Sequence, residues 1–140
     1  MDFKNTINYL FSQIFNAYRI NLEKSLNAVN LHSGQVFILI TLWSEDSQRQ
    51  SDIAKNLNLS PPTVNTMIKS LMDAGFVKLL RDESDGRATR VLLTEKGIEI
   101  RPEVEKIWQN LEDDVYSNLT ATEKIVLQQL LEKTLVNLLS

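Results

Sequence analysis

The chain has 140 residues, of which 43% are hydrophobic and 24% are charged, and this size allows one globular domain with its own core. It contains no cysteine, which excludes disulfides, thiolate metal sites, thiol-based redox sensing and cysteine nucleophiles. The net charge of −3 divides into −1 over residues 1–46, +2 over 47–97 and −4 over 98–140. The middle of the chain is therefore the part suited to contact with phosphate.

No segment resembles a membrane span or a secretory signal. The N-terminus lacks a basic stretch followed by a long apolar run, and the longest apolar-rich run, Val36 to Trp43, is far below the ~20 residues of a membrane span. We expect a cytoplasmic protein without a membrane partner.

An apolar stripe at helical spacing runs from Phe3 to Leu26 and predicts one long helix of about seven turns. The stripe is typical of a core or a dimer surface rather than of a cofactor site. A second helix is predicted from Ser33, a candidate N-cap, through Trp43. A polar loop over residues 45–49 follows.

Two helices and a tight turn are predicted next. Ser51 is a candidate N-cap for a helix over residues 52–57, and Asn58 and Leu59 form the turn. Ser60 has the profile of an N-cap and Pro61 that of a first helical residue, because the missing proline N–H costs nothing there. The inward face of this helix carries Val64, Ile68 and Leu71, and Gly75 is a candidate C-terminal stop.

Two segments of strand formers, Phe76 to Arg81 and Thr89 to Leu93, flank a polar segment that contains Asp85-Gly86 and predict a β-hairpin. Two helices joined by a tight turn and followed by a hairpin make a winged helix-turn-helix. Thr94 then caps a helix that Pro102 interrupts, which predicts a bend near residues 98–102. The capping box from Thr120 to Glu123 opens a leucine-rich last helix.

The expected fold is mainly α with a small β-hairpin wing: a winged helix-turn-helix lobe over residues 33–97, flanked by a helical dimerisation region over residues 1–32 and 98–140. The outer helices carry more apolar surface than a small winged domain can bury, although part of it packs onto the lobe itself. We expect a two-fold homodimer. The candidate dimerisation residues are Ile7, Leu10, Ile14, Leu127, Leu131, Leu135 and Leu138.

The outward side chains of the helix after Ser60 are short and polar, so its backbone can sit deep in a DNA major groove. The helix N-terminus suits phosphate contact by Ser60 and Thr63. Asn65 can pair with adenine, Thr66 can touch a thymine methyl, and Lys69 can reach guanine or phosphate.

The residues that carry these features also resemble a known family. Residues 50–78, QSDIAKNLNLSPPTVNTMIKSLMDAGFVK, resemble the helix-turn-helix of MarR regulators. Residues 85–97, DGRATRVLLTEKG, resemble their wing signature of Asp-x-Arg followed by hydrophobic-x-Leu-Thr-x-x-Gly. The order of the helices is similar over essentially the whole chain.

The resemblance implies that Arg87 reaches a minor groove from the wing tip while Asp85 holds the wing by pairing with arginine. A narrow minor groove concentrates negative potential and attracts arginine. The alternative is a solvated hairpin tip with an exposed ion pair. The candidate DNA-binding residues are Ser51, Ser60, Pro62, Thr63, Asn65, Thr66, Lys69, Ser70, Arg81, Asp85, Arg87 and Arg90.

Two departures from the family pattern bear on affinity. Thr66 and Ser70 stand where many members place arginines, and the wing tip is acidic at Asp82, Glu83 and Asp85. With fewer phosphate-neutralising charges, base contacts and symmetry must supply more of the affinity. Two recognition helices ~34–36 Å apart then predict a pseudo-palindromic operator.

MarR-like proteins commonly release DNA when a small, often aromatic, ligand binds between the helical region and the winged lobe. The candidate effector residues are Phe11, Phe15, Tyr18, His32 and Trp43, each of which ordinary core packing also explains. No cofactor is expected. One histidine and no cysteine cannot supply the usual zinc shell, although carboxylates alone stay open as metal ligands.

No catalytic set of residues and no phosphate-cradling glycine loop supports an enzyme. We expect a sequence-specific DNA-binding transcriptional regulator: a homodimeric repressor that binds double-stranded DNA. The alternative is a winged-helix module that binds another protein, which the acidic balance and the missing recognition-helix arginines permit.

Overall fold

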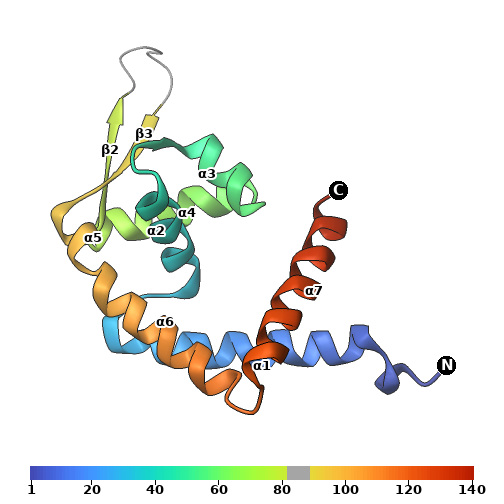
Figure 1. The fold of residues 1–140 in the computed structure, drawn as a ribbon. Helices are drawn as coiled ribbons and strands as arrows, with labels where there is room; N and C mark the ends of the chain where they lie inside the picture. Colours follow the sequence, from blue (N-terminus) through green and yellow to red (C-terminus); the bar gives the residue numbers. More distant parts are fainter. Residues whose placement is uncertain (82–88) are drawn as a thin grey trace. The chain divides into compact units, whose positions relative to one another are not determined.

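The structure is a computed structural model that describes residues 1–81 and 89–140. The chain forms two compact units, residues 1–107 and residues 108–140. Both consist mainly of helices, and the first also holds a small antiparallel sheet (Figure 1). In chain order, the elements are η1 (Phe3–Asn5), α1 (Ile7–Leu26), η2 (Asn27–Val29), α2 (Ser33–Ser44), β1 (Gln48–Arg49), α3 (Gln50–Leu57), α4 (Pro61–Asp73), β2 (Val77–Arg81), β3 (Thr89–Leu93), α5 (Glu95–Glu99), α6 (Arg101–Val115) and α7 (Ala121–Leu139).

The predicted fold class is confirmed, but the first helix is shorter than predicted. Phe3–Asn5 is a separate 3-10 turn, and α1 begins at Ile7. Thr6 is extended, with φ at −127°, and its side chain accepts the N–H of Tyr9 at 3.2 Å. This cap satisfies a free N–H at the helix start, so the helix begins after Thr6. The apolar spacing continues across this boundary and therefore did not reveal it.

Helices α2, α3 and α4 pack together around a closed apolar core. Its fully buried side chains include Ile38, Leu39, Ile53 and Ile68, each at most 1% exposed. Two helix starts differ from the prediction. Ser33 is the first residue of α2, with His32 as N-cap, and α3 begins at Gln50 because Arg49, rather than Ser51, is its N-cap.

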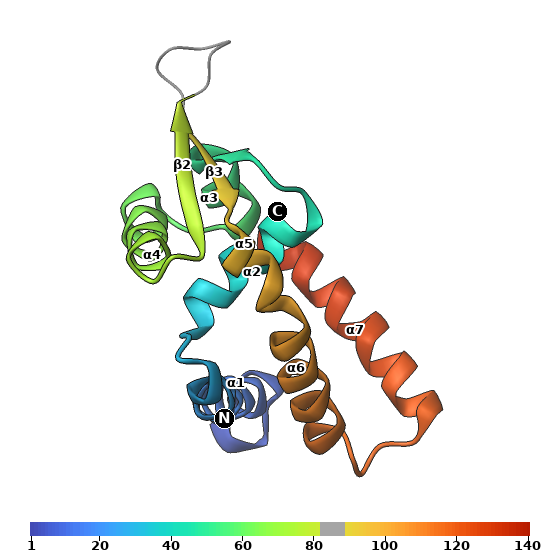
Figure 2. The same cartoon turned by 90° about the vertical axis from the view of Figure 1, so that its left-hand side faces the viewer.

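The sheet has the order β1-β3-β2. The predicted hairpin is confirmed: β2 pairs with β3 from Val77 opposite Leu93 to Arg81 opposite Thr89. Figures 1 and 2 both show these strands side by side. The expected loop before α3 instead contains β1, in which Gln48 lies opposite Val91 of β3. The short strand was missed because its pairing is a contact between residues distant in sequence.

The spacing Leu-Thr-x-x-Gly has a steric cause. Thr94 caps α5 by accepting the N–H of Gly97 at 3.1 Å, and its own hydroxyl donates to the carbonyl of Gly75 at 2.6 Å. A Cβ at Gly97 would overlap the carbonyl oxygen of Phe76. Only glycine therefore lets α5 approach the start of β2 this closely.

Where the sequence predicted one helix with a bend near residues 98–102, the structure has two separate helices. Helix α5 ends at Glu99, and α6 begins at Arg101. Pro102 thus lies in the first turn of α6, where a proline without an N–H is tolerated.

In the second unit, the predicted capping box opens α7. The N–H of Thr120 donates to Glu123 Oε1 at 2.9 Å, and the N–H of Glu123 donates to Thr120 Oγ1 at 3.1 Å. None of the 19 residues of α7 is buried. Within the described part of the chain, no helix combines the length and the apolar character needed to cross a membrane.

Candidate nucleic-acid interface

Helix α4 has a capped N-terminus and a strictly divided surface. Ser60 Oγ accepts the N–H of Thr63 at 3.4 Å, and Pro61 is the first helical residue, as predicted. The inward residues Val64, Ile68 and Leu71 are at most 1% exposed. This packing leaves the opposite face of α4 on the surface. The exposed outward residues are Pro62, Thr63, Asn65, Thr66 and Lys69.

The hydroxyl of Thr66 is already engaged. It donates to the carbonyl of Pro62 at 3.0 Å, within the helix. A contact from Thr66 to a thymine methyl would therefore use its own methyl group. The amide of Asn65 and the ammonium of Lys69 supply polar groups for a base edge or a phosphate.

Ser70 does not share the outward direction of this set. It is half-buried, its Oγ accepts from Gln35 Nε2 at 3.0 Å, and its hydroxyl donates to the carbonyl of Met67 at 2.8 Å. Ser70 thus faces α2, and helical spacing alone could not reveal a bond to a residue 35 positions away.

The remaining DNA-binding candidates lie on three elements. Ser51 is exposed in the first turn of α3, and Arg81 is exposed at the end of β2. Arg90 on β3 is half-buried, and its Nη1 donates to the carbonyl of Ser47 at 2.8 Å. Asp85 and Arg87 lie outside the described residues, as do Asp82 and Glu83.

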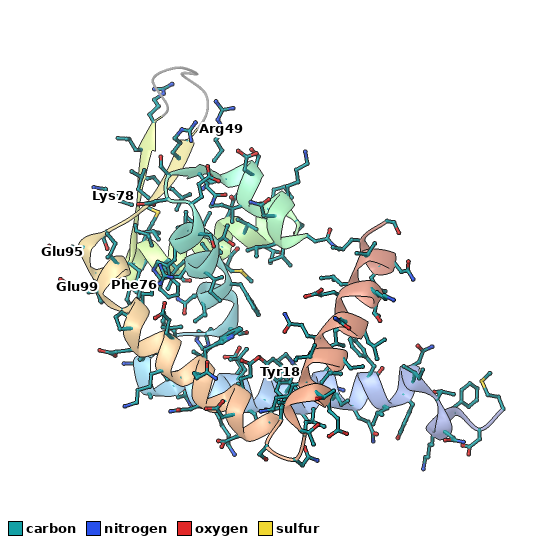
Figure 3. The ribbon with its side chains drawn as sticks, viewed as in Figure 1. Tyr18, Arg49, Phe76, Lys78, Glu95 and Glu99 are labelled. Atoms are coloured by element: carbon teal, nitrogen blue, oxygen red, sulfur yellow. The ribbon has the colours of Figure 1, made fainter. Side chains whose placement is uncertain are left out.

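Polar contacts at the base of the wing join α5 to α2 and to the end of α4. Trp43 Nε1 donates to the carbonyl of Gly97 at 2.9 Å. Lys96 Nζ donates to the carbonyl of Ala74 at 2.7 Å and lies 4.5 Å from the ring centroid of Phe76, within cation–π range. Figure 3 shows Phe76 at this end of the sheet, near Glu95 and Glu99 of α5. Trp43 therefore ties α2 to α5, the helix that follows the wing.

The other candidate effector residues lie on α1 and at the start of α2. Phe11 and Phe15 are 46% and 58% exposed on α1, and Tyr18 is half-buried on the same helix (Figure 3). His32 lines a cavity of about 360 Å³. The cavity lining is Arg19, Ile20, Glu23, Lys24, Asn27 and His32.

At this cavity, Glu23 holds the start of α2. Its Oε1 accepts the N–H of Ser33 at 3.0 Å, and its Oε2 lies 3.5 Å from His32 Nδ1. Hydrogen bonding from Ser33, followed by the interaction with His32, holds the pKa of Glu23 below its ordinary value.

Two buried glutamines were missed by the sequence analysis. Gln35 and Gln48 are each 8% exposed. The Gln48 amide donates to the carbonyls of Thr41 and Glu45 and accepts from Asn56 Nδ2 at 3.3 Å, so it joins the end of α2 to β1 and α3. For Gln35, the three-residue spacing from His32 is that of a capping box and was a usable signal in the sequence. For Gln48, the sequence offered no such signal.

The dimerisation candidates are almost all on the surface. On α1, Ile7, Leu10 and Ile14 are 85%, 57% and 54% exposed. On α7, Leu131, Leu135 and Leu138 are 41%, 52% and 69% exposed, and Leu127 is half-buried.

Comparison with known proteins agrees with this architecture. The family model described as MarR family matches residues 31–89. The HTH-type transcriptional regulator MgrA of Staphylococcus aureus is 30% identical over 115 residues, which cover 81% of this chain and 76% of the relative.

Two solved structures extend the match over nearly the whole chain. A MarR transcriptional regulator from Methanosarcina mazei Go1 is 29% identical, with a TM-score of 0.87, covering 95% of this chain and 96% of that one. MepR of S. aureus, solved in complex with DNA, is 26% identical, with a TM-score of 0.85, covering 94% and 98%. The chain therefore belongs to the MarR family of winged helix-turn-helix transcriptional regulators.

Proposed function

We propose that the chain is a homodimeric repressor that binds a pseudo-palindromic DNA operator through α4 and the wing. The exposed polar face of α4 carries this proposal, because a capped helix with short outward side chains fits a major groove. MepR, a relative of the same fold, was solved in complex with DNA, which supports the same partner here. We assign further contacts with the DNA backbone and the minor groove to Ser51, Arg81 and Arg87.

Exposed apolar side chains support the dimer. Helix α7 is 19 residues long and buries none of them, and the N-terminal half of α1 exposes its apolar stripe. Soluble monomers rarely expose contiguous apolar surface of this kind. A second copy would cover it and would place two α4 helices for two half-sites, one DNA turn apart.

Phe11 and Phe15 fit this dimer surface better than an effector site. They continue the exposed stripe of Ile7, Leu10 and Ile14 at three- and four-residue spacing. We therefore assign both aromatic residues to dimerisation.

The cavity at His32 supports regulation by a small aromatic carboxylate. Arg19 and Lys24 offer donors to a carboxylate, Ile20 offers apolar contact to a ring, and the acidic group of the lining, Glu23, is engaged with Ser33 and His32. An occupant would shift DNA binding only if it favoured one arrangement of the recognition helices over another.

An electrophoretic shift of the upstream region of the gene itself, repeated at rising salt, tests the proposed function. We expect a discrete complex at low salt that weakens steeply as salt rises, because phosphate contacts release counterions. Selection from random DNA should then yield pseudo-palindromic sites. Failure to bind either pool at low salt would contradict DNA binding and favour a protein partner.

A further inference from the structure

The rotation of α4 about its axis determines which side chains meet a base edge. Its buried residues, Val64, Ile68 and Leu71, determine which face of α4 turns inward, but apolar attraction itself is not directional and sets the exact angle less sharply. A hydrogen bond is directional and can fix such a rotation. Within residues 1–81 and 89–140, one side-chain hydrogen bond joins α4 to another element: that between Ser70 and Gln35 of α2.

The direction of this bond follows from its surroundings. The backbone N–H of His32 can only donate, and it lies 2.8 Å from Gln35 Oε1, so the amide nitrogen of Gln35 must point toward Ser70. The Ser70 hydroxyl donates to the carbonyl of Met67 at 2.8 Å, so its oxygen is left to accept. Both ends of a buried amide are satisfied in only this arrangement.

The Gln35 end of the bond is the fixed one. The N–H groups of His32 and Ser33, two free donors at the start of α2, are held by Gln35 and by Glu23. Glu23 belongs to α1, so the start of α2, which carries Gln35, is also bonded to α1. The side chain of Met67 on α4 fills the space beside Gly34 of α2, since a Cβ at Gly34 would come within 2.6 Å of Met67 Cε.

We propose that Gln35 is a positioning residue for DNA binding, which sets the rotation of the recognition helix through its hydrogen bond to Ser70. The inference rests on the proposed function. Gln35 itself touches no DNA and acts only through α4. Loss of the bond would leave α4 packed in place but able to rotate by a small angle, so that Asn65 and Lys69 would meet the base edges less often in the productive geometry.

The test compares Gln35→Met, Ser70→Ala and the double variant, with binding to the selected operator and to non-specific DNA measured by fluorescence anisotropy. We expect each single variant to lose about tenfold in operator affinity, the effect of one net hydrogen bond. The double variant should be no weaker than Gln35→Met, because both changes remove the same bond. Affinity for non-specific DNA should stay unchanged, since it depends on phosphate contact.

Three further variants and measurements separate positioning from simple damage to the fold. Ser70→Thr keeps the hydroxyl and should retain operator affinity. Ser25→Ala removes a hydroxyl whose partner among the described residues is the carbonyl of Asn21 within α1, and this variant should bind DNA as the wild type does. Circular dichroism and thermal unfolding should show folded protein at the assay temperature for every variant.

Additive losses in the double variant would overturn the inference and make Ser70 a direct DNA contact. Equal losses on operator and non-specific DNA, or no loss in either single variant, would also overturn it. These outcomes differ from failure of the proposed function, in which the wild type itself binds no DNA.

Discussion

The winged lobe and helix α7 differ in how far their apolar residues are buried. In the lobe, Ile38, Ile53 and Ile68 are at most 1% exposed, whereas α7 buries no residue and leaves Leu135 52% exposed. Helix α1 shows the same contrast along its length, with Leu26 buried near its end and Ile7 exposed at its start. The lobe therefore encloses a core of its own, while the outer helices leave most of their apolar stripe exposed.

The largest effect should come from breaking the surface of α7. The variant Leu131→Glu, Leu135→Glu places two carboxylates where we propose that two copies meet. We expect a monomer by sedimentation, and operator affinity at least about 100-fold lower, because two half-sites are no longer bound together. The lobe should stay folded, since neither leucine belongs to its core.

Gln129→Glu is the control for added charge, because it places one carboxylate at an exposed polar position of α7. It should remain dimeric. A dimer that persists in the double variant would show that α7 is not the interface.

A substitution at Gly97 should destabilise the lobe without changing the outer helices. Gly97→Ala forces a Cβ against the carbonyl of Phe76, and we expect a loss of about 2–3 kcal/mol in the free energy of unfolding, measured by thermal or denaturant unfolding. Below the transition, the variant should still sediment as a dimer.

Gly75→Ala provides the comparison for Gly97→Ala. Gly75 has φ at +84°, but a Cβ there meets only Lys96 Cδ at 3.7 Å, so we expect a cost of about 1 kcal/mol. A larger loss for Gly75→Ala than for Gly97→Ala would contradict the steric account of the wing base.

A smaller effect is expected from the wing tip. Arg87→Ala should weaken operator binding about tenfold, as loss of one minor-groove arginine contact does, and should leave the dimer intact. Anisotropy and sedimentation measure the two properties separately. Lys133→Ala on α7 is the control cation, and equal affinity of the Arg87 variant and the wild type would show that the wing assignment is wrong.

The smallest effect concerns stability at the corner of α1 and α2. Because the pKa of Glu23 is lowered in the folded state, its carboxylate stabilises the fold above its unfolded pKa of about 4.3, and this contribution is lost as the pH falls through the folded pKa. Glu23→Gln should therefore lower Tm slightly at pH 7, with the difference narrowing below pH ~4. The Glu23 side chain is 37% exposed, so the effect is small. A difference that does not depend on pH would contradict this origin.

Local signals predicted much of the fold. Ser60 with Pro61, and Thr120 with Glu123, act through hydrogen bonds within one turn, so sequence alone located both helix starts. The pairing of Gln48 with Val91 and the bond of Gln35 to Ser70 join distant positions, and no local pattern encodes them. The start of α1 was misplaced because apolar spacing does not register a capping threonine.

For the site, helix geometry located the outward face of α4 correctly but could not detect the inward turn of Ser70. It also could not distinguish a surface aromatic such as Phe15 from one that ties two helices together, such as Trp43. That difference depends on which elements pack together.

The mass of the protein–operator complex tests the central claim most directly. This one measurement reports both DNA binding by the winged lobe and pairing of two copies through the outer helices. Native mass spectrometry or sedimentation of the wild type with a selected duplex should give two chains per pseudo-palindromic operator. A complex of one chain per duplex, or no complex at low salt, would contradict the account.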